Sequence, residues 1–338
     1  MDNKNNSPLQ TMSQWLFGFQ ISQAIYVATK LSIADLLKEG PLNFEEIARI
    51  IKCDSDAVYR LLRTLASINI FEELSDKYFA NTDLSSLLME THESSIKSKV
   101  LLYGEEPYQV WGKLIDSVKS GEESFTSLYK NSFYSHLYQN PERFEVLSHY
   151  LKQTAAPRVQ AILQNYDFSS TKTLVDVGGG SGCMLAEIIQ KYTHIKGVLL
   201  DCDPVIADAK QEAITKGTVT NIEWVSGNYL ESVPPNADTY LLSHIIHSLN
   251  DEQALIVLNN CHRAMSKDGK LILIEALVND KNKFDIAKWM DLNMLVTTNG
   301  RERTEKETLE LLGKANFRFL SCVLIQSGVY LIEAQPLF

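Results

Sequence analysis

The sequence predicts a two-domain protein in which a helical N-terminal domain precedes an α/β domain with a mainly parallel sheet. The first half carries apolar residues at helical spacing, whereas the second half alternates short β-rich runs with helical stretches. The length of 338 residues exceeds one ordinary domain and suits two. We expect a helical domain over residues 1–100, a helical segment over 101–165 and an α/β domain over 166–338.

Composition and charge narrow the classes of partner. A composition of 45% hydrophobic and 22% charged residues is typical of globular domains with a core. The formal net charge of −10 repels nucleic acid and anionic membrane, so neither is expected as a partner. Five scattered cysteines form no C-x-x-C pair, which argues against a disulfide framework or a zinc–cysteine site. A polar N-terminus and short apolar runs favour the cytoplasm.

The first long helix is predicted over residues 12–37. Its apolar residues lie on more than one helical face, which predicts burial, with a partner chain as the covering surface. A homodimer formed through the N-terminal domain is therefore expected.

The next segment resembles a winged helix. Asn43 is the expected N-cap of a short helix, a turn and a second helix follow, and residues 71–81 have the pattern of a small β-wing. A winged helix can bind DNA through basic residues on its second helix, but this one offers only Arg60 and Arg63. Structural or dimerising use is favoured over DNA binding.

The second half has the order of strands and helices that gives right-handed crossovers and a parallel sheet. Residues 83–165 before it are mostly helical and rich in aromatic side chains, some of which could line a pocket for a flat substrate. The expected strands are 173–177, 197–201, 222–227, 239–244 and 270–277, followed by an antiparallel hairpin of 317–326 and 329–335.

The strongest motif is a glycine-rich turn between the first strand and the following helix. Gly178, Gly180 and Gly182 stand at G-x-G-x-G spacing, and Cys183 occupies the position where a dinucleotide fold has its third glycine. This spacing favours a ligand without a pyrophosphate. Asp201 ends the next strand, where a carboxylate can accept hydrogen bonds from both hydroxyls of a ribose.

At these residues the chain resembles a known family. It is similar to the plant-type small-molecule O-methyltransferases of the caffeic acid and acetylserotonin class and to their bacterial natural-product relatives, especially the phenazine-1-carboxylate methyltransferase subgroup. The stretches that carry the resemblance begin at Tyr26 (YVATKL), Tyr103 (YGEE), Val175 (VDVGGGSG) and Tyr240 (YLLSHII). The resemblance implies a Rossmann-like fold, S-adenosyl-L-methionine as cofactor and S-adenosyl-L-homocysteine as product.

The resemblance also implies which residues hold the cofactor. Asn228–Tyr229 stands where the family has Asp followed by Met or Phe, a pair that binds the adenine, and Ser243 stands where the plant enzymes have Lys. The implied cofactor residues are Asp176, Gly178, Gly179, Gly180, Gly182, Asp201, Cys202, Gly227, Asn228, Tyr229, Ser243 and His244.

Methyl transfer to a phenol at neutral pH needs a general base, and histidine suits that role. His247 matches the family's catalytic histidine, although Ser248 replaces the Asp that follows it there. Glu275 and Glu302 match two family carboxylates that flank and orient the base. His244 is expected to be a strand or pocket residue; a zinc pair with His247 is disfavoured because no third ligand is evident, and no metal is expected.

The acceptor is expected to be a small aromatic secondary metabolite. By resemblance the helix over 289–298 lines its pocket, and the candidate contacts are Asp291, Met294, Thr298, Trp111 and Tyr150. Three alternatives stay open: methyl transfer to nitrogen or carbon by proximity, a cofactor-sensing DNA-binding regulator, and a relative that binds the cofactor without methylating.

Overall fold

The computed structural model describes residues 7–216, 221–279 and 281–338. Its contacts divide the chain into two compact units, Met1–Tyr108 and Gln109–Phe338, so the segment 101–165 falls mostly within the second unit. Each unit has an apolar core of its own. Across the described ranges, no helix has the length and apolarity needed to cross a bilayer.

The first unit begins with three helices where one was expected. These are α1 (Pro8–Leu16), α2 (Gly18–Lys30) and α3 (Ile33–Leu36). The single helix over 12–37 was wrong because the chain breaks at Phe17 and again at Ser32, whose φ of 52° is left-handed. Large apolar side chains of α1 and α2 are exposed in the single chain, including Trp15 at 59% and Phe19 at 58%.

A winged-helix arrangement follows, and it contains a small sheet that includes the expected β-wing. Asn43 caps α4 as expected, because its side chain accepts a hydrogen bond from the Glu45 amide at 2.9 Å. On α5, Arg60 pairs with Asp56 at 3.9 Å. The elements are η1 (Leu37–Glu39), β1 (Leu42–Asn43), α4 (Phe44–Ile51), α5 (Ser55–Ala66), β2 (Phe71–Glu73), η2 (Ser75–Lys77), β3 (Tyr78–Asn81), α6 (Asp83–Ser86) and α7 (Lys97–Tyr103), with sheet order β1-β3-β2.

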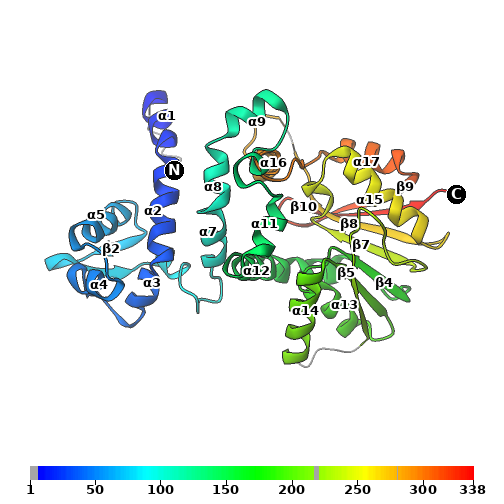
Figure 1. Ribbon diagram of the computed structural model, residues 1–338, viewed down its shortest axis with the longest axis horizontal. Helices are drawn as coiled ribbons and strands as arrows, with labels where there is room; N and C mark the ends of the chain where they lie inside the picture. The colour runs from blue at the N-terminus through cyan, green and yellow to red at the C-terminus, as the bar shows by residue number, and fades with distance from the viewer. Residues whose placement is uncertain (1–6, 217–220, 280) are drawn as a thin grey trace. The chain divides into compact units, whose positions relative to one another are not determined.

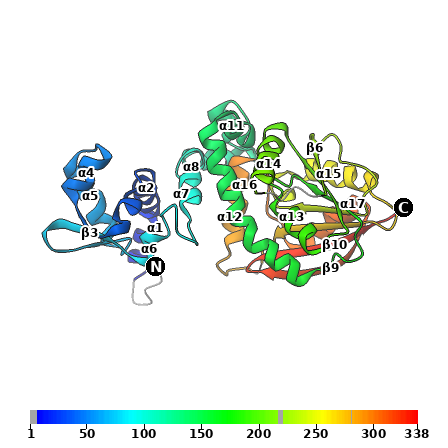
Figure 2. The same ribbon diagram turned by 90° about the horizontal axis from the view of Figure 1, so that it is seen from below.

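A run of helices leads into the sheet of the second unit. The long α12 begins at Pro141 with Asn140 as N-cap and accommodates Pro157 in its interior. It packs along α13, as the turned view shows (Figure 2). The helices are α8 (Glu106–Trp111), α9 (Leu114–Ser120), α10 (Phe125–Tyr129), α11 (Phe133–Gln139) and α12 (Pro141–Asn165).

The second unit contains a seven-stranded sheet of order β6-β5-β4-β7-β8-β10-β9 (Figure 1). The pairs from β6 to β8 are parallel, whereas β10 is antiparallel to both of its neighbours, as expected for a parallel sheet closed by a hairpin. The strands, close to their expected bounds, are β4 (Thr173–Val177), β5 (Lys196–Asp201), β6 (Ile222–Ser226), β7 (Thr239–Ser243), β8 (Lys270–Ala276), β9 (Phe317–Gln326) and β10 (Val329–Pro336).

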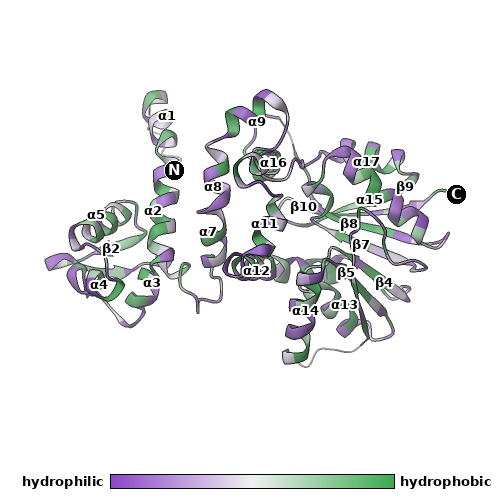
Figure 3. Cartoon of the chain, in the orientation of Figure 1, coloured by the Kyte–Doolittle hydropathy of each residue, from purple (hydrophilic) through white to green (hydrophobic). Residues whose placement is uncertain are grey.

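Helices cover both faces of this sheet. On one face, α12, α13 (Cys183–Lys191) and α14 (Asp203–Lys216) contribute to one apolar cluster. On the other face, α15 (Asp251–Ala264) and α17 (Glu305–Lys314) contribute to a second. Burial on both faces explains why the central strands are apolar almost throughout (Figure 3). Polar side chains are therefore left to the carboxyl ends of the strands, where such sheets bind ligands.

Candidate active site

The glycine-rich turn leaves β4 and enters α13 with three residues in the left-handed region. Gly178, Gly180 and Gly182 have φ values of 67°, 58° and 72°, which other residues adopt at a cost. The Gly178 amide donates to the Leu200 carbonyl at 2.8 Å, which ties the turn to β5. The glycines therefore fix a backbone path that a substitution would strain.

The turn has the shape of a ligand cradle. A Cβ placed on Gly180 would meet no described atom within 4 Å, so this glycine borders open space. Beneath it, Asp176 is buried, and its Oδ2 has no hydrogen-bond partner among the described residues. Burial, with a smaller contribution from Asp201, raises the pKa of Asp176 to about 7. A bound ligand that donates hydrogen bonds here would relieve that penalty.

Asp201 stands at the end of β5 and faces the same turn. Its Oδ2 accepts a hydrogen bond from the Gly180 amide at 2.9 Å and its Oδ1 accepts one from the Cys202 amide at 2.8 Å. Each oxygen keeps a second lone pair for a ligand hydroxyl. Cys202 is placed beside the site through its backbone.

The loop after β6 adds one aromatic ring to the cradle. The Gly227 amide donates to the Asp201 carbonyl at 3.0 Å, and Tyr229 lies 3.4 Å from the position of a Gly178 Cβ. Asn228 is exposed. Within its own turn, its side chain accepts a hydrogen bond from the Leu230 amide and donates one to the Glu231 carboxylate. Tyr229 therefore faces the glycine turn directly, while the Asn228 amide is engaged locally.

A tight turn after β7 forms the opposite wall, because a Gly178 Cβ would lie 2.5 Å from the Ile245 side chain. This turn is held by Glu275 at the end of β8. The Glu275 Oε1 accepts hydrogen bonds from the backbone amides of Ile245 at 3.2 Å and Ile246 at 2.9 Å. A buried carboxylate thus anchors the short helix η3 (Ile246–Ser248).

His247 lies on η3 and bonds to a buried carboxylate. Its Nδ1 is 2.7 Å from the Glu302 Oε1. This hydrogen bond leaves the His247 Nε2 to act on a ligand. Glu302 is held in turn, because its backbone amide donates to the Asp291 Oδ1 at 3.0 Å. The three residues predicted for catalysis, His247, Glu275 and Glu302, therefore lie together.

The surroundings of His247 favour its protonated form. Burial alone would lower its pKa, but the Glu302 carboxylate, with a smaller contribution from Glu275, outweighs burial and raises it above 6.5. Burial raises the pKa of Glu275 itself to about 7. The site can thus accept a proton on His247 and stabilise the resulting imidazolium.

His244 lies beside His247, with ring centroids 5.0 Å apart. Its backbone is left-handed at φ 54°, and its buried Nε2 finds no hydrogen-bond partner in the described ranges. Burial, followed by the charges of Arg158 and His247, lowers the His244 pKa well below 6.5. The sequence showed no third ligand for these histidines, whereas the structure places a Glu275 oxygen within 4.8 Å of a ring nitrogen of each. Glu275 lies on β8, the strand paired with β7. Spacing along the sequence does not show that these two strands lie side by side.

Ser243, the residue before His244, also points its hydroxyl into a buried position. Its Oγ lacks a partner among the residues the structure describes. It stands with the cradle residues at the carboxyl end of β7, as expected for a ligand contact.

Arg303 is a buried positioning residue that sequence reasoning missed. Its guanidinium donates to the carbonyls of Ile246 at 3.0 Å and Leu249 at 3.1 Å, and it pairs with Asp251 at 2.7 Å. These bonds hold the end of η3 from the side opposite Glu275. The sequence does show Arg303 directly after Glu302, but only the Glu302 carboxylate was considered as a candidate.

The acceptor candidates gather around α16 (Ile286–Thr297). The Trp111 Nε1 donates to the Asn293 Oδ1 at 3.0 Å, a contact that the sequence did not suggest because Asn293 was not a candidate. Met294 is buried, and the Thr298 hydroxyl donates to the Met294 carbonyl at 3.3 Å. Asp291 holds the Glu302 backbone, so its observed contact is with the catalytic loop.

The long helix α12 contributes a half-buried cation that sequence reasoning also missed. Arg158 has a buried Nε without a hydrogen-bond partner in the described structure. Burial lowers its pKa, while the charges of Tyr150, Cys183 and Glu275 act against that shift. Arg158 therefore lies among the glycine turn, the acceptor candidate Tyr150 and the catalytic turn. The available signal was its isolation, because it is the only basic residue between Lys152 and Lys172.

Two tyrosines of α11, Tyr134 and Tyr138, lie near the same site. Burial raises the pKa of both Tyr134 and Tyr138, and the charge of Asp201 is near enough to raise each further. They belong to the aromatic residues that the sequence suggested for a pocket.

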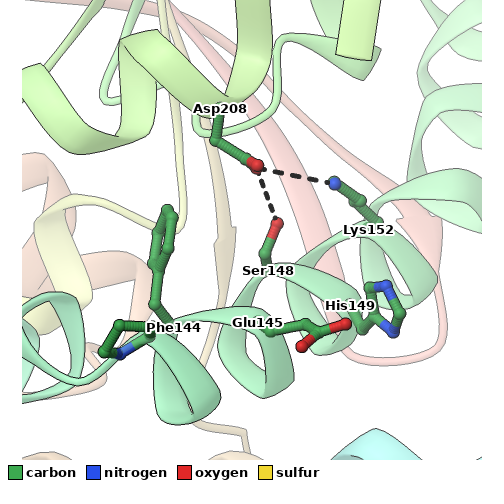
Figure 4. A pocket seen from close by; sticks show the side chains of 7 residues that line it. Phe144, Glu145, Ser148, His149, Lys152 and Asp208 are labelled. Carbon is green, nitrogen blue, oxygen red and sulfur yellow. Dashed lines mark hydrogen bonds and ion pairs between the residues drawn. The ribbon is translucent and has the colours of Figure 1, made fainter. Parts of the chain in front are cut away.

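A surface pocket on the outer side of α12 is separate from these residues. It lies between α12 and α14, and the Ser148 hydroxyl donates to the Asp208 Oδ2 at 3.1 Å (Figure 4). Lys152 pairs with the same carboxylate at 3.7 Å and with Glu212 at 2.5 Å. These contacts fasten α12, which carries Tyr150 and Arg158, to the helix that follows Asp201.

Comparison with known proteins identifies this architecture. Residues 111–318 match the O-methyltransferase domain, and residues 13–91 match the O-methyltransferase dimerisation domain. The chain belongs to the O-methyltransferase family. The similarity expected from the sequence motifs, including the phenazine subgroup, is confirmed.

Two curated relatives cover nearly the whole chain. Phenazine O-methyltransferase PhzM of Lysobacter antibioticus is 32% identical over 328 residues, which are 96% of this chain and 95% of that protein. Phenazine-1-carboxylate N-methyltransferase of Pseudomonas aeruginosa is 32% identical over 319 residues, 94% of each. The crystal structure of LaPhzM superposes with a TM-score of 0.92 at 31% identity, covering 98% of this chain and 100% of that one.

Structures of relatives also define the cofactor. NcsB1, an O-methyltransferase from neocarzinostatin biosynthesis, was solved with S-adenosylmethionine and 2-hydroxy-5-methyl naphthoic acid; its TM-score is 0.86 at 25% identity, covering 94% of this chain and 96% of that one. S-Adenosylmethionine is the cofactor of this enzyme, and the open glycine turn with its unpartnered Asp176 oxygen fits such a ligand. When bound, it supplies a methyl group activated by a sulfonium.

The pKa values of His244 and His247 shift in opposite directions, which gives a direct test of this geometry. In the ligand-free chain we expect a His247 pKa above 6.5 and a His244 pKa well below it, measured by NMR titration of the imidazoles. Glu302→Gln removes the charge that stabilises the imidazolium, so the His247 pKa should fall. Glu310→Gln, at an exposed site, is the control. An unchanged His247 pKa in Glu302→Gln would contradict the Nδ1–Oε1 contact.

Proposed function

We propose that the enzyme transfers a methyl group to a hydroxyl of a small aromatic acceptor, with His247 as general base. The observation that supports this most is the 2.7 Å contact between the His247 Nδ1 and the Glu302 Oε1. A histidine held in this way presents its Nε2 to the acceptor with a lone pair available. A phenolic hydroxyl, which ionises near pH 10, needs such a base at neutral pH.

In the proposed mechanism His247 takes the hydroxyl proton as the acceptor oxygen attacks the methyl carbon. Glu302 and Glu275 stabilise the imidazolium that forms, because both raise the His247 pKa. Glu275 also keeps the turn in place through the amides of Ile245 and Ile246. Attack forms the carbon–oxygen bond and breaks the carbon–sulfur bond, so the other product is S-adenosyl-L-homocysteine.

The cofactor would lie between the glycine turn and the β7 turn. Asp201 would accept hydrogen bonds from the ribose, and Tyr229 would cover the adenine. Arg158 would pair with the methionine carboxylate, because a guanidinium with a buried Nε that lacks a partner among the described residues suits an anionic group. The remaining proposed contacts are Asp176, Gly178, Gly179, Gly180, Gly182, Cys202, Gly227, Asn228, Ser243 and His244.

The acceptor would lie on the other side of His247, against α16 and α12. Met294 and Tyr150 supply apolar and aromatic surface for a flat ring. The Trp111–Asn293 hydrogen bond and the Thr298 hydroxyl give this surface polar groups that can select substituents on the ring.

Substitution of His247 tests the proposed function. With an acceptor phenol, we expect the wild type to add one methyl, detected by product mass and by S-adenosylhomocysteine release. His247→Ala should lower kcat by about 10²-fold or more, the size of general-base catalysis. The exposed His194→Ala is the matched control. Turnover that survives the His247 change, or a methyl found on nitrogen, would sink the hydroxyl-directed mechanism.

The pH profile gives an independent readout of the same proposal. Since the base must be unprotonated, kcat/KM should rise with pH through an apparent pKa above 6.5. In Glu302→Gln this limb should move to lower pH.

The next prediction concerns the cofactor site. Asp201→Ala and Arg158→Met should each weaken S-adenosylhomocysteine binding about 10- to 150-fold, since hydrogen bonds to charged groups contribute about 1.5–3 kcal/mol. Isothermal titration calorimetry measures the affinity. Asp203→Ala, an exposed carboxylate two residues after Asp201, should bind normally. Wild-type affinity in Arg158→Met would show that the guanidinium does not hold the cofactor.

We also propose a homodimer formed through the N-terminal unit. The dimerisation-domain match supports it, and so does the apolar surface of the first two helices. Leu9, Trp15, Leu16 and Phe19 are all more than half exposed in the single chain. Apolar side chains of this size are seldom left in water together, so a partner that covers them is favoured.

The dimer prediction is tested by placing negative charges on this surface, so that the surfaces of two copies repel each other. Trp15→Glu combined with Phe19→Glu should shift the sedimentation coefficient from that of a dimer to that of a monomer. Leu324→Glu, which is 55% exposed on β9, should leave the dimer intact. A wild-type chain that sediments as a monomer at micromolar concentration would refute the proposal.

A further inference from the structure

Two histidines and a glutamate converge at the carboxyl ends of β7 and β8. One ring nitrogen of His244, one of His247 and one oxygen of Glu275 all lie within 4.8 Å of one another. The two rings meet nearly edge to face, at an interplanar angle of 67°. The mechanism above uses His247 and Glu275, whereas it gives His244 a place among the cofactor contacts and no part in proton transfer.

The side chains of His247 and Glu275 are each held by a side-chain contact, and His244 is placed through its backbone. His247 is oriented by Glu302 through Nδ1, which leaves Nε2 for the centre of the group. The Glu275 Oε1 is occupied by two backbone amides, so its Oε2 is free. His244 is fixed through its own backbone amide, which donates to the Ile274 carbonyl at 2.9 Å.

Two of the three inward atoms have no other partner. Among the residues that the structure describes, neither the His244 Nε2 nor the Glu275 Oε2 makes a hydrogen bond, and both atoms are buried. Buried polar atoms without a partner are uncommon, so both of these atoms are available to coordinate a cation.

We propose that His244, His247 and Glu275 form a site for a transition-metal cation of the Zn²⁺ class, and that its occupation inhibits methyl transfer. Two imidazoles and one carboxylate are a ligand set that zinc takes with a fourth position open. The inhibition rests on His247 being the base proposed above, because the metal takes the Nε2 lone pair that the acceptor proton needs. Metal binding itself does not depend on that role.

The geometry needs only small side-chain movements to close on a metal. Zinc–nitrogen bonds of about 2.0–2.1 Å place tetrahedral ligand atoms about 3.4 Å apart. The present separations of up to 4.8 Å shorten to that value by rotation of the imidazoles and the carboxyl group. The Glu302–His247 hydrogen bond supplies the carboxylate–histidine–metal arrangement that orients a metal ligand.

The choice of metal follows from the donor atoms. Mg²⁺ and Ca²⁺ prefer six or more oxygen ligands, which two imidazoles do not provide. Imidazole nitrogen suits Zn²⁺, Cu²⁺, Ni²⁺ and Co²⁺. The nearby charges permit a cation, since the carboxylates of Glu275 and Glu302 outnumber the guanidinium of Arg158.

The test measures metal binding directly on the full chain, freed of metal by a chelator and dialysed. Zn²⁺ affinity is obtained by competition with a chromophoric chelator, and the ligand type is read from the visible spectrum of the Co²⁺ form. We expect one site with nitrogen and oxygen ligands. Thiolate charge-transfer bands from the cysteines would overturn the assignment.

The variants test whether the proposed ligands bind the metal in a chain that still folds. His244→Asn removes the imidazole and keeps a residue that tolerates a left-handed backbone, so it should fold and lose Zn²⁺ binding at this site. Glu302→Gln should weaken binding about 10- to 100-fold through the orientation of His247. His194→Ala should bind normally. Unchanged affinity in a folded His244→Asn, confirmed by circular dichroism, would disprove the site.

Inhibition is measured in parallel. Added Zn²⁺ should abolish methyl transfer by the wild type, a chelator should restore it, and higher acceptor concentration should raise the Zn²⁺ needed. Binding without inhibition would overturn the second half of the proposal. If methylation does not depend on His247, the proposed function fails, yet the affinity measurements on His244→Asn still decide whether the metal site exists.

Discussion

The hydrogen bonds from the amides of Ile245 and Ile246 to the Glu275 carboxylate are the constraint on which the active site depends. They join the ends of β7 and β8 and force the chain into the turn that carries both histidines. Burying a carboxylate for this purpose is costly, and the pKa of Glu275 near 7 reflects that cost. Arg303 holds the far end of the same turn through the Ile246 and Leu249 carbonyls. A turn fixed at both ends keeps the His247 ring aimed without help from a ligand.

Much of this arrangement could be predicted from the sequence. The glycine turn, Asp201 and the strand order follow from local patterns, because a G-x-G-x-G turn needs positive φ and parallel strands end at one edge. His247, Glu275 and Glu302 were found through the family resemblance, and the structure brings them together. Their roles stay predictions until the variants are measured.

The sequence could not show contacts between residues that lie on different helices and strands. Arg158 lies on a helix far along the chain from the glycine turn, and no local pattern reports which way its guanidinium points. The third group beside His244 and His247 comes from another strand, so spacing along the chain could not reveal it. The break at Ser32 was missed because apolar periodicity continues through it, although its φ of 52° ends the helix.

The similarity of the relatives shows how little sequence separates acceptor classes. Two proteins that are each 32% identical to this chain are named for methylation of oxygen and of nitrogen. The shared fold positions the methyl donor for either atom, so the difference must come from a few side chains around the acceptor. A base whose pKa is raised by two carboxylates is needed for a hydroxyl and gives little to an amine with a free lone pair.

The distribution of charge in the site is suited to a cationic donor. Asp176, Asp201, Glu275 and Glu302 surround it, and burial raises the pKa of the first three. A sulfonium at the proposed position between the glycine turn and the β7 turn would favour the ionised form of these carboxyl groups, because opposite charges stabilise each other at short range. In the proposed mechanism, methyl transfer removes that positive charge and places a proton on His247. The imidazolium would then replace the sulfonium as the cation beside the carboxylates, so the net charge of the site would stay the same through the reaction.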